Sequence, residues 1–441
     1  RVARIRRGVV PPRTTRGQEG AARVARVEAY ILVVFMIDVR SDSDITRSCA
    51  MAAAFTVHPP THTRWLSDAD IHSATDLTGK TALVTGATSG LGRAAATALA
   101  KRGATVMLGV RNVEAGKRIA AAIEAETGCA PGSVTVGPPL DLDSNESVRS
   151  FARDVSSKCP RLDLLVNNAG TNFLPKAFTP EGVGRIAQIN FLGPAALTRA
   201  LEAPILAAAD QSGVANIVHV SSVTHRYASI ANVKNFLTSW DAGSYAATKL
   251  ANVLFAYECH RRWGVRGVRS SAVDPGAIYS NLWDNDPVFS SPPMRFILGL
   301  TYAPPSDGAT AVVTASLAPF HEIQTGSALG VKAPEDPTRR LRFYARGLFA
   351  SKVVAGCAPG IMGTSSAETA KWYANYYAWG LATLAVSMLD WPVRRCTGGR
   401  AAGRTAEVPS SPASYDEKVA SELWEEAGKA AQAAKPEVLV G

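Results

Sequence analysis

A tyrosine and a lysine stand four positions apart in residues 244–255, whose pattern of apolar residues predicts an amphipathic helix. At that spacing Tyr245 and Lys249 lie on one helical face, about one turn apart. An ammonium group beside a phenol stabilises the phenolate, so we expect Lys249 to lower the pKa of Tyr245 from its usual value of about 10. Such a phenol can exchange a proton with a carbonyl or alcohol oxygen. The pair alone is a weak signal, because chance matches are common in a chain of 441 residues.

A glycine-rich turn supplies the context that this pair lacks. The apolar run 80–85 predicts a strand, and the alanine-rich run 93–100 predicts a helix. Between them, Gly86 would permit a tight turn, Gly90 would let the backbone approach a pyrophosphate, and Gly92 would allow close packing of helix on strand. The phosphates would lie at the helix N-terminus, where unpaired N–H groups attract anions. The order of strand, glycine turn and helix therefore predicts a dinucleotide site.

The end of the next predicted strand, 104–110, indicates which dinucleotide is bound. A NAD site commonly has an acidic residue about twenty residues beyond the glycines, where it binds the ribose 2′-hydroxyl. This chain has Arg111 there, and Arg93 beside the last glycine. Cations suit a 2′-phosphate, so we expect NADP(H) rather than NAD(H). The alternative is that Arg111 is a solvated loop charge.

These and further motifs resemble those of the short-chain dehydrogenase/reductase family, and within it the retinol-dehydrogenase-like group. The matching stretches follow the family's order and are residues 85–92, 140–142, 164–170, 189–193, 217–222, 244–255 and 274–276. Residues 409–415 and 420–424 resemble that group's C-terminal helix. The resemblance covers residues 77 to about 330 and specifies the family, whereas it leaves the substrate open.

The resemblance assigns catalytic roles to four matching residues. Ser222 would hydrogen-bond the substrate oxygen, Tyr245 would exchange its proton, and Lys249 would bind the nicotinamide ribose as well as tune the phenol. Asn190 would support a proton relay through water near Lys249. Ser222 is preferred over Ser221 because the family places its catalytic serine second in the pair, and alternation along a strand would point Ser221 to the other face.

The resemblance also implies the residues that bind NADP(H). Asp141 would meet the adenine amino group, and residues 168–170 would line the adenosine ribose. The nicotinamide end would be lined by Pro275, Gly276 and Ser280. The expected cofactor-binding residues are Gly86, Ser89, Gly90, Leu91, Gly92, Arg111, Asp141, Leu142, Asn168, Ala169, Gly170, Tyr245, Lys249, Pro275, Gly276 and Ser280.

Three positions differ from the group's pattern or invite another role. Asp274 stands where the group commonly has histidine before Pro-Gly, and Ser280 stands where threonine is usual, a change that keeps the hydroxyl. His225 follows the catalytic serine and could be assigned as a base. A structural or substrate-lining role is preferred for it, because Tyr245 already supplies the proton transfer.

Charge and cysteine content argue against other classes of protein. The net charge is +10, but residues 1–50 alone hold ten arginines and five acidic residues. The rest of the charge needs no polyanionic partner, so no nucleic acid is expected. The six cysteines show no metal-binding spacing, so no metal site is expected. They are interpreted as reduced thiols of an intracellular protein.

The patterns divide the chain into five parts. Residues 1–50 form a basic arm, either a transit peptide or an over-extended gene model with Met51 as the true start. The other parts are an N-terminal extension at 51–76, the NADP-binding catalytic domain at 77–330, an insertion at 331–406 and a C-terminal helical segment at 407–441. The expected location is intracellular, in the cytoplasm or a plastid.

The insertion at 331–406 contains a basic amphipathic stretch at 339–349 and an aromatic-rich apolar run at 372–392. Three interpretations stay open: a lid over the substrate site, which we prefer, a helix at a membrane interface, and a membrane span. The apolar run is at the lower edge of the length that spans a bilayer, whereas aromatic residues beside arginines suit an interface. In the interfacial interpretation the cations facing anionic lipid would include Arg339, Arg340 and Arg342.

We therefore expect a Rossmann-type α/β domain with a doubly wound parallel sheet and the substrate over the carboxyl ends of its strands. The strands are predicted near 80–85, 104–110, 133–137, 162–166, 216–221 and 268–273. The expected reaction is hydride transfer between NADP(H) and a carbonyl–alcohol pair on a hydrophobic small molecule. The resemblance implies a retinoid, steroid-like or lipid substrate, with residues 223–240 and 278–305 shaping the pocket.

Two other functions stay open. One is a protochlorophyllide-reductase-like enzyme, which would reduce a C=C bond of a tetrapyrrole in light. The other is a non-catalytic NADP(H)-binding component of a membrane complex. The intact set of Asn190, Ser222, Tyr245 and Lys249 argues against the second, because a pure sensor needs no proton donor. Peripheral membrane contact and homo-oligomer formation are open predictions as well.

Overall fold

The computed structural model describes residues 64–65, 68–172, 174, 178–238, 244–284, 289–325, 341–346, 405–407 and 410–432. All of them belong to one compact unit, His58–Gly441. The predicted basic arm at 1–50 and residues 347–404 of the predicted insertion lie outside the described residues.

The described strands form one sheet in the order β1-β9-β8-β7-β6-β5-β2-β3-β4. Its parallel part consists of β2 (Thr81–Thr85), β3 (Thr105–Gly109), β4 (Val134–Val136), β5 (Leu164–Asn167), β6 (Ala215–Val220), β7 (Val268–Asp274) and β8 (Arg342–Arg346). Two short strands, β9 (Thr405–Glu407) and β1 (Arg64–Trp65), extend the β8 edge in antiparallel pairing.

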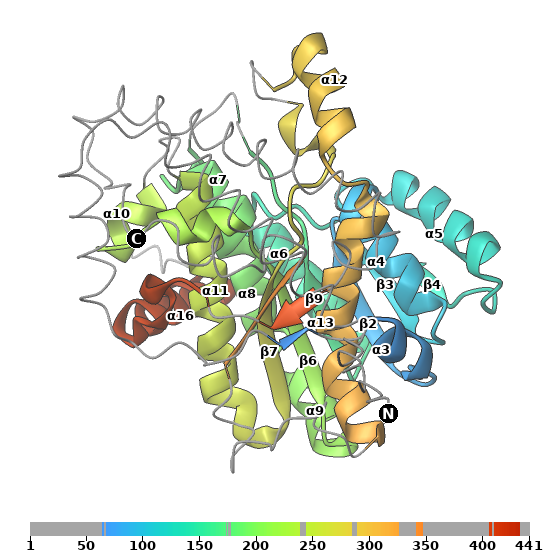
Figure 1. The fold of residues 1–441 in the computed structure, drawn as a ribbon. Coiled ribbons are helices and arrows are strands. Elements are labelled where there is room, and N and C mark those ends of the chain that lie inside the picture. Colours follow the sequence, from blue (N-terminus) through green and yellow to red (C-terminus); the bar gives the residue numbers. More distant parts are fainter. Residues whose placement is uncertain are drawn as a thin grey trace, which may run out of the picture. The chain divides into compact units, whose positions relative to one another are not determined.

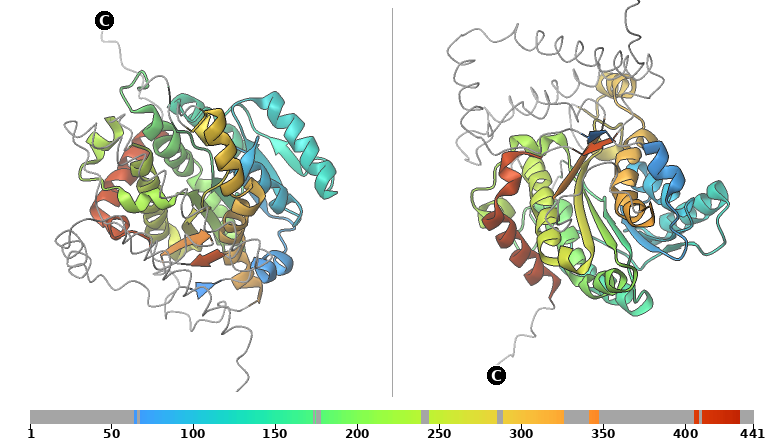
Figure 2. Two further views of the ribbon diagram at one scale, coloured as in Figure 1. Left: turned by 45° about the horizontal axis from the view of Figure 1, so that its top comes forward. Right: turned by 60° about the horizontal axis from the view of Figure 1, so that its bottom comes forward.

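Helices cover both faces of the parallel part, as Figure 2 shows. Helices α4 (Gly90–Ala100), α5 (Val113–Thr127) and α13 (Pro305–Thr325) pack on one face, and α6 (Asn145–Lys158), α8 (Gly193–Ala200) and α11 (Ser244–Trp263) on the other. Strands buried on both faces need near-continuous apolar sequences, and every residue of β5 and β6 is buried. The predicted doubly wound α/β fold is confirmed.

The other described helical segments are shorter or lie at the margins of these layers. They are α3 (Asp68–Ala74), α7 (Arg185–Ala187), η1 (Gln188–Leu192), α9 (Glu202–Ser212), η2 (Val223–Tyr227), α10 (Val233–Thr238), η3 (Gly264–Arg266), η4 (Asn281–Trp283), α12 (Pro292–Thr301), η8 (Pro412–Tyr415) and α16 (Glu417–Ala431). None of the helices that the structure describes is long and apolar enough to cross a membrane.

The order of the strands changes direction at β2: Figure 1 shows β3 and β4 on one side of β2, and β6 and β7 on the other. From β2 the chain runs outward through β3 to β4, then returns to β5 on the other side of β2 and continues through β6 and β7 to β8. The loops that follow β2 and β5 therefore diverge and leave a crevice at the carboxyl ends of the strands. Ligands of doubly wound sheets usually bind in this crevice.

The six predicted strands are confirmed. The predicted insertion at 331–406 has the wrong boundaries, because residues near both of its ends belong to the sheet. Arg342–Arg346 form the parallel strand β8 beside β7, and Thr405–Glu407 form β9. All five residues of β8 are buried, so Arg342 cannot face lipid as the interfacial interpretation requires. A short basic and aromatic run has no periodicity that separates a strand from a surface segment, and here Phe343 and Tyr344 fill the core at the sheet edge.

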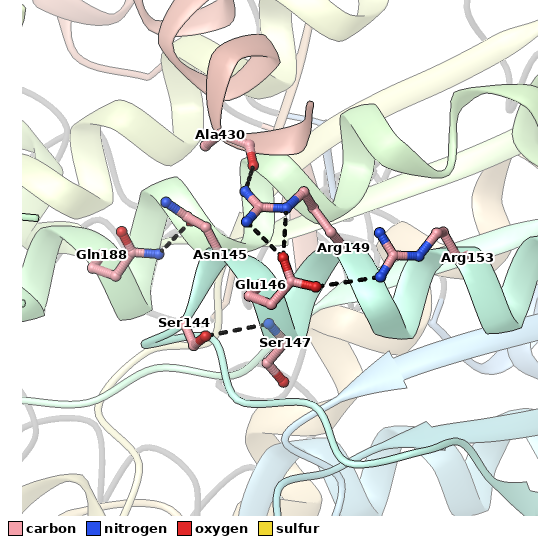
Figure 3. A network of polar contacts seen from close by, with 8 residues as sticks. All are labelled: Ser144, Asn145, Glu146, Ser147, Arg149, Arg153, Gln188 and Ala430. Carbon is pink, nitrogen blue, oxygen red and sulfur yellow. Dashed lines mark hydrogen bonds and ion pairs between the residues drawn. The ribbon is translucent and has the colours of Figure 1, made fainter. Parts of the chain in front are cut away.

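The C-terminal segment packs against the catalytic layer through α16. Trp424 of this helix contacts two guanidinium groups, that of Arg199 at 3.9 Å and that of Arg262 at 4.8 Å from its ring centroid. Arg149 of α6 donates a hydrogen bond of 3.2 Å to the carbonyl oxygen of Ala430, which Figure 3 shows. The predicted C-terminal helix is therefore present, and it stabilises the face of the sheet that carries α11.

Candidate active site

A cavity of about 620 Å³ lies at the carboxyl ends of the parallel strands. Most of the predicted site residues line it, namely Gly86, Ser89, Gly90, Leu91, Arg111, Asp141, Leu142, Asn168, Ala169, Gly170, Ser222, Tyr245, Lys249, Pro275, Gly276 and Ser280. Gly92 and Asn190 do not line it. Residues from seven separate stretches of sequence thus meet in the crevice that the strand order creates.

The glycine turn after β2 has the geometry that its sequence predicts. Gly86 has a φ of 67°, in the region that favours glycine. A Cβ on Gly92 would lie 2.4 Å from the carbonyl oxygen of Gly86, so only glycine fits between helix and turn. Gly90 has open space where a Cβ would lie, and its backbone is accessible from the cavity. These three positions confirm the tight turn, the close packing and the open approach.

The N-terminus of α4 is suited to an anion. Ser89 precedes the helix without a side-chain capping hydrogen bond, and the first turn contains no acidic residue. Its backbone N–H groups point towards the end of the cavity lined by Ser89, Gly90 and Leu91. The chemistry of this end therefore fits the pyrophosphate of a dinucleotide.

Arg111 follows β3 at the cavity wall and makes no hydrogen bond or ion pair with any described residue. Arg93, by contrast, lies 3.7 Å from the carboxylate of Glu126 at the surface. No acidic residue occupies the end of β3, where Asn112 caps α5 by accepting the N–H of Ala115 at 2.9 Å. A free guanidinium at this place fits a phosphate better than a 2′-hydroxyl.

Thr85 and Asn168 hold the ends of β2 and β5 together beside the glycine turn. The Thr85 hydroxyl accepts the backbone N–H groups of Asn168 and Ala169, both at 3.1 Å. The Asn168 side chain donates to the Thr85 carbonyl at 2.9 Å. This pairing fixes the floor of the cavity at the point where the strand order reverses.

The predicted catalytic residues meet at the opposite end of the cavity. Ser222 and Tyr245 share a side-chain hydrogen bond, and the Lys249 ammonium lies 5.4 Å from the centre of the tyrosine ring. Lys249 Nζ donates to the carbonyl oxygen of Val220 at 3.1 Å. Ser221, in contrast, donates its hydroxyl proton to the Lys249 carbonyl at 2.8 Å. Because the Ser221 hydroxyl is hydrogen-bonded to the backbone of α11, the geometry favours Ser222 as the catalytic serine, as predicted.

The protonation of this end differs from the sequence prediction. Burial raises the pKa of Tyr245 above its usual range, the charge of Asp274 raises it further, and the Ser222 hydrogen bond lowers it only in part. Burial also lowers the pKa of Lys249 to about 8, although the negative charge of Asp274 acts to raise it. The prediction that Lys249 lowers the pKa of Tyr245 is therefore wrong. Loss of water around the phenol outweighs the ammonium, which is directed at a backbone carbonyl.

Asn190 lies in η1, a π-helical turn of the kind often found at functional sites. Its side chain accepts the N–H of Thr171 at 2.7 Å and donates to the Thr171 carbonyl at 2.8 Å. A Cβ on Gly170 would lie 3.3 Å from Asn190 Oδ1 and 3.5 Å from Lys249 Nζ. The predicted proximity of Asn190 to Lys249 is present, with Gly170 between them.

A polar network fixes η1 relative to the loop after β4. Gln188, two residues before Asn190, donates to the Leu142 carbonyl at 3.0 Å and to Asn145 Oδ1 at 2.9 Å. Figure 3 shows Gln188 facing Asn145 at the start of α6. This network links the segment that carries Asn190 to the Asp141–Leu142 wall of the cavity.

His225 has a structural role and does not line the cavity. Its Nε2 accepts the backbone N–H of Ser411 at 3.2 Å, so the ring proton must lie on Nδ1, which donates to the Ser222 carbonyl at 2.6 Å. Burial and the charge of Arg226 hold its pKa well below the usual value. A neutral His225 thus joins the serine loop to the C-terminal segment, so the structural alternative is confirmed and the substrate-lining one is wrong.

Sequence motifs gave no sign of the apolar wall at the catalytic end. Phe289 and Tyr302 line the cavity and pack with Leu298 of α12 in a small buried cluster. On its other face α12 exposes Phe296 and Leu300, at 69% and 53%. The only prediction that covers these residues is the range 278–305, which is expected to shape the substrate pocket. Among the residues that the structure describes, no cluster of side chains could hold a metal ion.

Comparison with known proteins places this fold and site in a class. The family model for short chain dehydrogenases matches residues 80–287. Polyprenol dehydrogenase of Mus musculus is 35% identical over 263 residues, which are 59% of this chain and 78% of that protein. The chain belongs to the short-chain dehydrogenase/reductase family, whose members are oxidoreductases that use NAD(P)(H).

Within the family, the chain is related to retinol and polyprenol dehydrogenases. Retinol dehydrogenase 11 of Mus musculus is 36% identical over 222 residues, which are 50% of this chain and 68% of that protein. The crystal structure of an uncharacterized protein from Mycobacterium paratuberculosis aligns with a TM-score of 0.50 and 24% identity, over 83% of this chain and 98% of that one. At this identity the structural likeness shows the fold alone.

Proposed function

We propose that the protein is an NADP(H)-dependent oxidoreductase that interconverts a carbonyl and an alcohol on a hydrophobic small molecule. One observation carries the proposal: Ser222, Tyr245 and Lys249 share a single cavity with the anion-binding N-terminus of α4. A proton donor and a dinucleotide site on one cavity are the two requirements of carbonyl reduction.

Tyr245 is the group that delivers the proton. Its raised pKa keeps the phenol protonated at neutral pH, so it can donate to the carbonyl oxygen as charge develops there. Ser222, already hydrogen-bonded to the phenol, would hold the same oxygen beside it. The Lys249 ammonium, 5.4 Å from the centre of the tyrosine ring, would bind the nicotinamide ribose and so place the cofactor beside the phenol. When bound, NADPH supplies the hydride.

The preference for NADP(H) is supported by the end of β3. Arg111 is a cation on the cavity wall without a partner among the described residues, and no acidic residue stands at that strand end. An acidic residue there would bind a ribose 2′-hydroxyl and repel a 2′-phosphate. The guanidinium would instead form charge-assisted hydrogen bonds to the phosphate.

A hydrophobic substrate, such as a retinoid, steroid-like or lipid carbonyl, is supported by the apolar wall and by the relatives. Ile278, Phe289 and Tyr302 line the cavity near the catalytic end. Related proteins carry the names polyprenol dehydrogenase and retinol dehydrogenase 11. We also retain as proposals an intracellular location, peripheral membrane contact and homo-oligomer formation, the second of which depends on residues within 347–404.

The test is consumption of NADPH and of NADH by the full chain with retinal, a steroid ketone, an aliphatic aldehyde and a quinone. We expect NADPH oxidation with at least one hydrophobic carbonyl and much slower oxidation of NADH. NADPH binding without turnover on any carbonyl would favour the non-catalytic alternative. Light-dependent turnover with strong pigment absorbance would favour the protochlorophyllide-reductase-like one.

A further inference from the structure

A buried carboxylate lies directly behind the catalytic residues. Asp274 ends β7 with 2% of its surface exposed, and it does not itself line the cavity. Its Oδ1 accepts the N–H of Gly276 at 3.0 Å, and the carboxylate also accepts the N–H of Val223. Gly276 belongs to the turn at the nicotinamide end, and Val223 follows Ser222. One side chain therefore joins the two loops that border the reacting end of the cavity.

The groups that face Asp274 are two cations and a phenol. Arg226 of η2 and Lys249 of α11 both interact with it as positive charges. The hydrogen bond of Lys249 Nζ goes to the neutral carbonyl of Val220, so Asp274 supplies the opposite charge for this buried ammonium. Tyr245 faces Asp274 as well, and Tyr302 of the neighbouring wall acts in turn on Tyr245. The carboxylate thus acts on both members of the tyrosine–lysine pair.

We propose that Asp274 is a positioning residue of the active site, whose carboxylate fixes the Ser222 loop against the Pro275–Gly276 turn and supplies the opposite charge for the buried Lys249 ammonium. This inference rests on the proposed function, in which Tyr245 donates a proton to a carbonyl oxygen. A nearby negative charge favours the ammonium and disfavours the phenolate, so its effect should appear in the pH dependence of the reduction.

The pH dependence has a definite sign. The charge of Asp274 raises the pKa of Tyr245 and of Lys249, so its removal lowers both. The alkaline limb of the reduction, where either group loses its proton, must then move to lower pH. Burial raises the pKa of Asp274 itself to about 6. Below that pH the wild-type side chain is largely uncharged, so wild type and a charge-neutral variant should converge.

The test uses Asp274→Asn in the full chain, because asparagine keeps the size and can still accept the Gly276 N–H while it removes the charge. The measurement is kcat/KM for aldehyde reduction with NADPH from pH 5 to 10. We expect the alkaline limb to fall by about one pH unit or more, the usual scale for a nearby charge. If Asp274→Asn does not fold, Asp274→Ser offers a smaller acceptor for the same measurement.

Asp163→Asn is the matched control. Asp163 is a buried carboxylate that precedes β5, at the other end of the sheet, where it pairs with Lys80 at 3.0 Å and accepts the N–H of Thr81 at 2.9 Å. Removal of the Asp163 charge should lower Tm and leave the pH profile of kcat/KM unchanged. A folded Asp274 variant with a lower Tm but an unchanged alkaline limb would overturn the proposal, since that is the result of a merely structural role.

The failure of this inference differs from the failure of the proposed function. If Tyr245→Phe kept both the activity and the alkaline limb, the phenol would not be the proton donor and the proposed function would be wrong. If Tyr245→Phe lost activity while Asp274→Asn kept the wild-type limb, only the role of Asp274 would be wrong.

Discussion

The two ends of the cavity are built from different groups. At the end near β3, the site consists of a glycine turn, the backbone N–H groups of α4 and the guanidinium of Arg111, which has no partner among the described residues. At the end near β7, it consists of three ionisable side chains, the half-buried Tyr245 and the buried Lys249 and Asp274. The first end recognises its ligand by backbone shape and an open approach, whereas the second works through charges held away from water.

This difference determines which substitutions matter at each end. Near β3 a substitution is limited by the space for its side chain, because a Cβ on Gly92 would overlap the backbone of Gly86. Near β7 the effect of a substitution depends on the charge that it adds or removes, because burial and neighbouring charges both shift the pKa values of Tyr245 and Lys249. Variants near β3 should therefore change binding and leave pH profiles alone, and variants near β7 should do the reverse.

Arg111→Asp should produce the largest change at the β3 end. Loss of charge-assisted hydrogen bonds to the 2′-phosphate and the new repulsion should weaken NADPH binding by about ten- to a hundredfold. NADH binding should change little or improve. Titration of both cofactors against the variant checks this, and equal weakening of the two would mean that Arg111 does not contact the phosphate.

Gly92→Ala should destabilise the fold at the same end. The added methyl would lie 2.4 Å from the Gly86 carbonyl oxygen and 2.5 Å from Asn168 Nδ2. Overpacking of this kind costs about 1–3 kcal/mol of unfolding free energy, and the displaced turn should also weaken NADPH binding.

Gly299→Ala is the matched control for that substitution. Gly299 lies in α12 with open space where a Cβ would lie. Alanine is the better helix former by up to about 1 kcal/mol, so Tm should hold or rise. Equal stability of Gly92→Ala and Gly299→Ala would contradict the close packing at the turn.

Two buried histidines near β6 should make the protein sensitive to acid. Burial lowers the pKa of His219 to about 3 and holds that of His225 well below its usual value. Both stay neutral in the folded state but protonate below about pH 6.5 in the unfolded chain. Their contribution is therefore fully present above that pH and is lost as pH falls towards the folded pKa values.

The expected slope is up to about 1.4 kcal/mol of unfolding free energy per pH unit for each histidine. Urea unfolding at pH 7.5, 6.5 and 5.5 measures it, and His219→Gln should remove one histidine's share. A stability that does not change between pH 6.5 and 5.5 would contradict neutral, buried histidines. NADPH affinity at the β3 end should vary less over this range, because none of the described residues that line the cavity is a histidine.

Local patterns predicted the β3 end well and the β7 end only in part. The glycine turn, the strand before it and Arg111 lie within about thirty residues of one another, and their types reflect constraints on local backbone. The positions of Ser222, Tyr245 and Lys249 could also be predicted. Their protonation could not, because it depends on burial and on Asp274 from another strand.

Contacts between distant segments account for the other errors. His225 gains its structural role from Ser411, 186 residues later in the chain. The strand β8 follows β7 only after a long connection. Its two arginines made a surface segment the expected interpretation, although all five residues are buried. Neither partner can be inferred from spacing, since both depend on which strands become neighbours in the sheet.

The most direct test of the proposed chemistry is Tyr245→Phe, which removes the transferable proton and keeps the ring. Turnover of a hydrophobic aldehyde should fall by at least about a hundredfold, the usual scale for a general acid. The affinity for NADPH, measured by titration on the same preparation, should stay near wild type because the β3 end is untouched. A variant that keeps more than half of the wild-type turnover would contradict the assignment of Tyr245 as the proton donor.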